Sequence, residues 1–327
     1  MMTRSFVRLA AASLCLAAAP AMAQFTSLTV FGDSLTDSGN NALVIGADPT
    51  QVITGNTYIP SRPYAGGTYS NGSTWVSSFA AGIGLPAGGA PSLAGGGNVA
   101  YGGARTTING PVAGFPFSAA TQVNSFLSGA PTVLAGSGLY VIAIGGNDVR
   151  GAGDAVAADP ANAATIIGTA AANYAAGVGS MVDALQARGA VNIVVWGVPD
   201  VGRSPAALAA GPAAAGAASF ISNSFNGALQ GRLAGETFGV RYFDVAGTLS
   251  GVFASPSSFG FSNVTDACGA VAGCNPSTYV FWDAIHPTSA AQALVAGAML
   301  TAVPEPASVL LMALGVAGLI AARRRQA

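Results

Sequence analysis

The chain has 327 residues, of which 51% are hydrophobic and only 8% are charged, and its formal net charge is −1. This apolar content is sufficient for a large core and excludes a wholly disordered chain. Between residues 24 and 302, seven Arg and no Lys stand against eleven Asp and one Glu, so this region lacks the basic surface that nucleic-acid binding requires.

The first 23 residues have the pattern of a secretory signal peptide. Arg4 and Arg8 provide a positive start, an apolar run follows over residues 9–19, and residues 21–23 (A-M-A) form a small-residue cleavage site. The apolar run is short for a membrane-spanning helix. We therefore expect export and a mature chain that begins at Gln24.

Four short apolar runs predict buried β-strands: residues 27–31, 139–144, 191–196 and 240–245. The first three end at a glycine. Two Ala-rich segments with mostly helical spacing of their apolar residues, 160–188 and 212–233, separate the later strands. Strands that alternate with helices favour parallel β-α-β units in one sheet. Because no composition break divides residues 24–302, we predict a single α/β domain there.

Two segments are predicted to be loops. Residues 88–97 are rich in glycine, and the length of this connection suggests a surface that faces substrate. Cys268 and Cys274 lie six residues apart in a segment rich in glycine and alanine. In an exported chain this pair predicts a local disulfide, because two thiolates alone cannot complete a zinc site.

The C-terminal residues 303–327 contain a Pro-Glu-Pro motif, an apolar stretch over 307–322 and three arginines at 323–325. Such a stretch is marginal for crossing a hydrocarbon core of about 30 Å, and the arginines favour a cytoplasmic end. This tail resembles the PEP-CTERM sorting signal of Gram-negative bacteria. The resemblance implies transient anchoring in the inner membrane by a short transmembrane helix, processing by an exosortase-type enzyme, and a protein in the cell envelope or outside the cell.

His286 is the only histidine in the chain, and Asp283 precedes it by three residues. A lone histidine is more often structural than catalytic. A carboxylate bonded to one ring nitrogen, however, leaves the other nitrogen free to take a proton from a hydroxyl. Pro287 prevents a helix from continuing through His286, and Thr288 can cap a helix over 289–300. The pair is therefore predicted on a loop at the start of a helix.

The nucleophile for such a base must come from elsewhere in the chain. No G-x-S-x-G motif occurs, which excludes the common nucleophile elbow of the α/β-hydrolases. Ser34 instead follows the first predicted strand, in residues 32–35 (G-D-S-L). Open parallel sheets place their ligand crevice at this end of the strands. The alternative role for Asp33 or Ser34 is a helix cap.

The G-D-S-L run resembles the first sequence block of the GDSL esterase/lipase family, whose members are also called SGNH hydrolases. Three further blocks follow in the family's order: residues 98–104 (N-V-A-Y-G-G-A), 145–148 (G-G-N-D) and 283–286 (D-A-I-H). Residues 69–75 resemble a stretch that is common between the first two blocks. The resemblance covers about residues 28–288. It implies a flavodoxin-like fold with three layers, α/β/α, around a mainly parallel sheet.

The resemblance also implies the chemistry of a serine esterase or lipase that acts on a carboxylic ester. Ser34 would attack the acyl carbonyl, His286 would act as base and then acid, and Asp283 would orient the imidazolium. The oxyanion would be held by the backbone N–H groups of Ser34 and Gly103 and by the side-chain amide of Asn147.

Several details remain expectations at this point. Gly102 and Gly103 are adjacent in their block, so the motif does not choose between them. Asp33 and Asp148 are expected to hold turns rather than to react. We expect no cofactor and no metal. The predicted organisation is a signal peptide (1–23), a hydrolase domain (24–302) and a sorting signal (303–327).

The sequence leaves alternatives to the esterase function. A polysaccharide O-deacetylase of the envelope would use the same residues, whereas cleavage of a peptide, thioester or phosphodiester would be other chemistry on the same scaffold. Phosphodiesterases usually recruit metals or cationic clamps, which one histidine and scattered arginines supply poorly. A non-catalytic surface or matrix binding protein would be expected to lose Ser34, Asn147 or His286, and all three are present.

Overall fold

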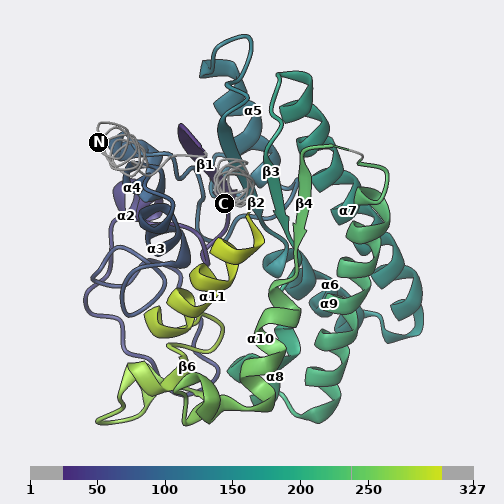
Figure 1. Ribbon diagram of the computed structural model, residues 1–327. Coiled ribbons are helices and arrows are strands. Elements are labelled where there is room, and N and C mark those ends of the chain that lie inside the picture. Colours follow the sequence, from purple (N-terminus) through teal and green to yellow (C-terminus); the bar gives the residue numbers. More distant parts are fainter. Residues whose placement is uncertain (1–24, 237, 304–327) are drawn as a thin grey trace, which may run out of the picture. The chain divides into compact units, whose positions relative to one another are not determined.

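The computed structural model describes residues 25–236 and 238–303 (Figure 1). The predicted signal peptide, the Pro-Glu-Pro motif and the apolar stretch over 307–322 lie outside these ranges. Within them, no helix combines the length and the apolar character that a membrane crossing needs.

In the described ranges, the main sheet is parallel and has four strands that lie side by side in chain order. They are β1 (Ser27–Gly32), β2 (Gly138–Ala143), β3 (Ile193–Trp196) and β4 (Val240–Phe243). Every residue of β2 and β3 is buried. Strands that are buried on both faces have continuous apolar sequences, which is why these two are visible in the sequence.

Three helices cover one face of the sheet: α5 (Ala119–Gly129), α7 (Ala163–Ala187) and α9 (Pro212–Leu233). Phe31, Ile142 and Val195 point to this face and form a core with residues of all three helices. The predicted helices over 160–188 and 212–233 correspond to α7 and α9.

Two other helices cover the opposite face: α3 (Trp75–Gly82) and α11 (Ser289–Ala302). Successive residues of a strand point to opposite faces, so Val30, Val141 and Val194 enter this second core. The fold therefore has three layers, α/β/α, as Figure 1 shows and as the sequence predicted. Thr288 caps α11 as expected, because its Oγ1 accepts the Ala291 N–H at 3.3 Å.

The remaining helices of the described ranges are shorter or lie beside the sheet: α2 (Asn40–Ile45), α4 (Pro86–Gly89), α6 (Gly146–Ala158), α8 (Pro205–Ala209) and α10 (Val245–Ala254). A second parallel sheet consists of β5 (Asn263–Ala267) and β6 (Tyr279–Phe281). It leads directly into the segment that carries Asp283 and His286.

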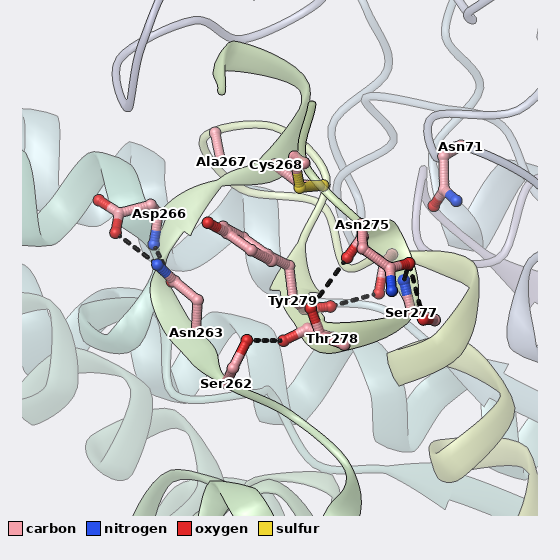
Figure 2. The surroundings of a disulfide bond; sticks show 12 residues. Asn71, Ser262, Asn263, Asp266, Ala267, Cys268, Asn275, Ser277, Thr278 and Tyr279 are labelled. Carbon is pink, nitrogen blue, oxygen red and sulfur yellow. Dashed lines mark hydrogen bonds between the residues drawn. A yellow bond between two sulfur atoms is a disulfide. The ribbon is translucent and has the colours of Figure 1, made fainter. Parts of the chain in front are cut away.

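The connection between β5 and β6 is closed by a disulfide between Cys268 and Cys274, whose Cα atoms lie 5.6 Å apart (Figure 2). The predicted bridge is thus confirmed. Beside it, the Asn263 amide donates to the Asp266 carboxylate at 2.7 Å. These contacts stabilise a connection that is long and glycine-rich.

Residues 88–97 are not the plain loop that the sequence predicted. This segment contains α4 and a short 3₁₀ turn, and it runs along the edge of β1. The Val30 N–H donates to the Gly97 carbonyl at 3.0 Å. A Cβ atom at Gly97 would collide with the Leu28 carbonyl oxygen, and one at Gly88 would collide with the Leu28 side chain. The glycines therefore allow close packing against the strand.

Candidate active site

The ends of β1 and β2 bring two predicted site residues together. Gly32 pairs with Ala143 in the parallel ladder, so the two strands end at the same edge of the sheet. Ser34 follows β1 by two residues, and Asn147 lies in the first turn of α6, directly after β2. Both residues line the same hollows at this edge.

His286 lies between Ser34 and Asp283. Its Nε2 is 2.8 Å from Ser34 Oγ, and its Nδ1 is 2.8 Å from Asp283 Oδ2. A carboxylate only accepts, so Nδ1 carries the ring proton and Nε2 can accept the serine proton. The three residues are 8%, 3% and 0% exposed for Ser34, His286 and Asp283. These three hydrogen-bonded residues, the relay, are shielded from bulk water except at Ser34.

The turn before α11 positions Asp283 and His286 relative to one another. Asp283 Oδ1 accepts the backbone N–H groups of Ile285 and His286 at 2.9 and 2.7 Å. One carboxylate thus fixes both the backbone and the ring of the histidine. This explains why the spacing of three residues in D-x-x-H was readable in the sequence.

Tyr64 is a partner of the relay that the sequence did not reveal. Its hydroxyl donates to Asp283 Oδ2 at 2.8 Å in a buried setting. Burial is the main reason that the pKa of Tyr64 is raised, and the nearby Asp283 charge acts in the same direction. The tyrosine therefore stays protonated and serves as a donor to the carboxylate.

Residues 69–75 hold the histidine segment in place. The Tyr69 ring packs against His286, with 5.4 Å between ring centroids. The Ser70 hydroxyl donates to the Pro287 carbonyl at 2.8 Å, and Asn71 Oδ1 accepts the Ser289 N–H at the same distance. Residues 69–75, which resemble a stretch common in the family between the first two blocks, therefore hold His286 and the residues after it in position.

Gly102 and Gly103 are distinguished by their hydrogen bonds. The Gly102 N–H donates to Asp37 Oδ2 at 3.0 Å, and a Cβ atom at Gly102 would collide with the Tyr69 ring. The Gly103 N–H has no partner within the described ranges, and this residue has a φ of +81° that favours glycine. Of the two, Gly103 offers the free donor.

The Asn147 amide is held at both of its ends. Its Nδ2 donates to the Ala104 carbonyl at 3.0 Å, and Arg150 Nη1 donates to its Oδ1 at 3.4 Å. These two contacts fix the orientation of the amide and leave its second N–H available to a ligand. Arg150 was not identified in the sequence, although its position three residues further along α6 places it on the same face.

Three aspartates surround the site, of which Asp33 and Asp37 are buried and Asp148 is partly buried. Asp37 accepts the N–H groups of Gly39, Asn40 and Asn41 in addition to that of Gly102, and so joins the first two sequence blocks. Asp148 Oδ2 accepts both the N–H and the hydroxyl of Thr106 at 2.9 Å.

Asp33 is the aspartate next to Ser34. Its Oδ1 accepts the Leu35 N–H at 3.0 Å, so it holds the turn as expected, and Asp148 also has the expected structural contacts. Burial raises the pKa of the Asp33 carboxyl to about 7. This acid is therefore mostly neutral below neutral pH.

Two hollows meet at Ser34, Asn147 and His286. The first, the apolar pocket, has a volume of about 90 Å³ and extends between α10 and α11. The second, the wide cleft, has a volume of about 430 Å³ and is bounded by Tyr69 and Gly103. Among the described residues, no group of three or more His, Cys, Asp or Glu side chains could hold a metal ion.

Comparison with known proteins agrees with this geometry. The family model "GDSL-like Lipase/Acylhydrolase" matches residues 28–299, and the chain belongs to this family. A PEP-CTERM protein-sorting motif matches residues 302–325 and points to export in a Gram-negative bacterium.

Individual relatives are more distant. The chain is 30% identical to an uncharacterized protein of the trpE-trpG intergenic region of Pseudomonas putida, over 89% of this chain and 51% of that protein. It is 32% identical to Lipase 1 of Photorhabdus luminescens, over 55% of this chain and 23% of that protein. The chain thus spans about half, or less, of the length of these curated relatives. A solved structure of phospholipase A1 from Streptomyces albidoflavus NA297 has a TM-score of 0.44 and 17% identity, over 84% of this chain and 98% of that one.

Proposed function

We propose that the protein is an exported serine esterase or lipase that hydrolyses carboxylic esters through an acyl-enzyme. One observation carries the proposal: Ser34, His286 and Asp283 form a continuous hydrogen-bonded relay at the point where the two hollows meet. A hydroxyl, a neutral imidazole and a buried carboxylate in this order are the groups that nucleophilic acyl transfer requires.

In the first half of the reaction, Ser34 Oγ forms a bond to the acyl carbon while its proton moves to His286 Nε2. The carbonyl oxygen becomes an oxyanion, which the N–H groups of Ser34 and Gly103 and the free amide N–H of Asn147 stabilise. Asp283 stabilises the imidazolium. The bond to the alcohol then breaks, and the imidazolium returns its proton to the leaving oxygen.

In the second half, water attacks the acyl carbon and gives a proton to His286. The bond between the acyl carbon and Ser34 Oγ then breaks, the acid leaves, and the imidazolium returns its proton to Ser34 Oγ. No metal or cofactor takes part in these steps. Losing one oxyanion donor typically lowers turnover on the order of 10²-fold or more. This sets the expected effect of Asn147→Ala or Asn147→Asp.

The test is a panel of nitrophenyl esters from acetate to palmitate with the wild type, Ser34→Ala and His286→Ala. The proposal expects hydrolysis by the wild type and a loss of at least three orders of magnitude in both variants. Circular dichroism spectra and melting curves would verify that the variants fold. Hydrolysis that persists in folded Ser34→Ala would reject the role of Ser34, and a wild type inactive on every ester would favour a binding protein.

An acylated envelope polysaccharide is the second candidate substrate. The wide cleft supports it, because a volume of about 430 Å³ beside the nucleophile accommodates a sugar ring. Release of acetate from acetylated polysaccharide by the wild type but not by Ser34→Ala would favour this substrate. No release, together with hydrolysis of lipid esters, would exclude it.

The same proposal includes the route of export. Residues 1–23 would be removed as a signal peptide, residues 24–302 would be the hydrolase domain, and residues 303–327 would anchor the chain transiently in the inner membrane until an exosortase-type enzyme acts. The PEP-CTERM match over residues 302–325 supports this order. The mass of the protein isolated from its native host tests it, since a chain that still ends at Ala327 would contradict processing.

A further inference from the structure

The apolar pocket and the wide cleft differ in chemistry although they share Ser34, Asn147 and His286. The pocket wall consists mainly of apolar side chains that include Val201, Leu249 and Phe253. The cleft is larger and has more polar surroundings, with Asn41 and Ser61 beside its apolar residues, whereas Arg150 lines both hollows. An ester has two parts on either side of its carbonyl carbon, so the two hollows can hold them separately.

Apart from the Arg150 guanidinium and the Trp196 indole N–H, most polar groups that line the apolar pocket are already engaged with the protein. Asp200 accepts the Gly202 N–H at 3.0 Å and the Ser219 hydroxyl at 2.6 Å. The Ser204 hydroxyl donates to the Val201 carbonyl at 2.7 Å.

Gln292 is engaged in the same way. Its Oε1 accepts the Trp75 N–H at 3.1 Å, and its Nε2 donates to the Leu35 carbonyl at 3.4 Å. A hydroxyl-rich group in this pocket would lose its bonds to water and would find few replacements. A hydrocarbon chain would instead gain free energy from burial.

We propose that the apolar pocket binds the acyl chain of a short fatty ester, while the wide cleft binds its alcohol part. This inference rests on the proposed ester hydrolysis and specifies its substrate class. Carbonyl attack by Ser34 requires only that the chain enters from the shared mouth, where the serine, the histidine and the Asn147 amide lie together.

The pocket volume sets the length of the chain. A cavity of about 150 Å³ holds benzene, which has six carbon atoms, so a pocket of about 90 Å³ takes a chain of about four carbon atoms. Butanoyl to hexanoyl chains would therefore fill it, whereas an acetyl group would leave most of it empty. Each buried methylene should raise kcat/KM by up to about fourfold until the pocket is full.

Leu249 is the position at which to test this assignment, because it lies on α10, lines the pocket and is only partly buried. Leu249→Trp reduces the space available to the chain, and Leu249→Ala enlarges it. Leu93→Trp is the matched control, since Leu93 is 52% exposed on the segment along β1 and lines neither hollow. All variants are compared by their ratios of kcat/KM, so that each enzyme serves as its own reference.

Two substrate series separate the parts of the ester. In the first, nitrophenyl esters vary the acyl chain from acetyl to dodecanoyl; in the second, alkyl acetates vary the alcohol from methyl to octyl. We expect the wild type to prefer butanoyl or hexanoyl over acetyl by at least tenfold and to show little dependence on alcohol length. Leu249→Trp should lower the ratio of hexanoyl to acetyl turnover at least tenfold, and Leu93→Trp should leave it unchanged.

The remaining outcomes are decisive as well. If Leu249→Trp does not fold, Leu249→Ala still tests the assignment, because it should move the optimum to longer acyl chains. An acyl profile unchanged in the Leu249 variants, or a length dependence that follows the alcohol, would overturn the assignment. If the wild type hydrolyses no ester, or Ser34→Ala retains full activity, the proposed function fails instead.

Discussion

The buried carboxyl of Asp33, next to Ser34, leads to a prediction about stability and pH. Asp33 is 3% exposed, and burial raises the pKa of its carboxyl from 3.8 to about 7, against the opposing effects of the Leu35 N–H and of His286. Because the folded-state pKa is raised, the folded protein holds this proton more tightly than the unfolded chain does. The Asp33 contribution to stability is complete below about pH 4 and is lost as pH rises through about 7, by about 4 kcal/mol in total.

Asp33→Asn removes this titration and keeps an oxygen that can accept the Leu35 N–H. The difference in unfolding free energy between the variant and the wild type should therefore shift by about 4 kcal/mol in favour of the variant between about pH 4 and pH 8. Urea unfolding followed by tryptophan fluorescence at several pH values measures this difference. Its change with pH, rather than its absolute value, is the predicted quantity.

Asp48 provides a control with the opposite sign. The hydroxyl and N–H of Thr50 donate to its exposed carboxylate and hold its pKa below the ordinary value. Any pH-dependent effect of Asp48→Asn should therefore disfavour the variant as pH rises. A stability difference between Asp33→Asn and the wild type that stays constant over the whole range would refute the reasoning.

Three further predictions concern residues around the site. Tyr64→Phe removes a buried donor to the catalytic carboxylate and should lower the unfolding free energy by about 1.5–3 kcal/mol together with kcat, as measured by urea unfolding and steady-state kinetics. Arg150→Met should lower kcat by about tenfold with a smaller effect on KM, because Asn147 keeps its donor but loses its fixed orientation, and Arg150→Lys should restore part of the loss. Replacing Cys268 and Cys274 by Ser should cost roughly 2 kcal/mol of stability, the value for so short a loop, and reductant should then have no further effect on melting.

The parts of the fold that could be predicted from the sequence are those with a strong local pattern. β2 and β3 are buried on both faces, so each is an apolar run followed by glycine, and α7 and α9 are long enough for helical spacing to be evident. The parallel sheet then brings the ends of β1 and β2 together. For this reason the proximity of Ser34 and Asn147 could be predicted from the sequence.

The contacts that could not be predicted join segments that are distant in sequence. Tyr64 and Asp283 are 219 residues apart, and nothing local to either residue indicates the hydrogen bond between them. The packing of the glycines in residues 88–97 against β1 could not be predicted for a related reason. A glycine that avoids a collision with a neighbouring strand cannot be distinguished, by sequence alone, from a glycine in an exposed loop.

The central claim is that Ser34 is the nucleophile, activated by His286 and oriented toward the shared mouth of both hollows. Labelling with a fluorophosphonate ester, followed by peptide mapping in a mass spectrometer, measures this directly. The account predicts one covalent phosphonyl group, on Ser34, and at least a hundredfold slower labelling in His286→Ala. An unlabelled protein, or a label on another residue with Ser34 unmodified, would contradict it.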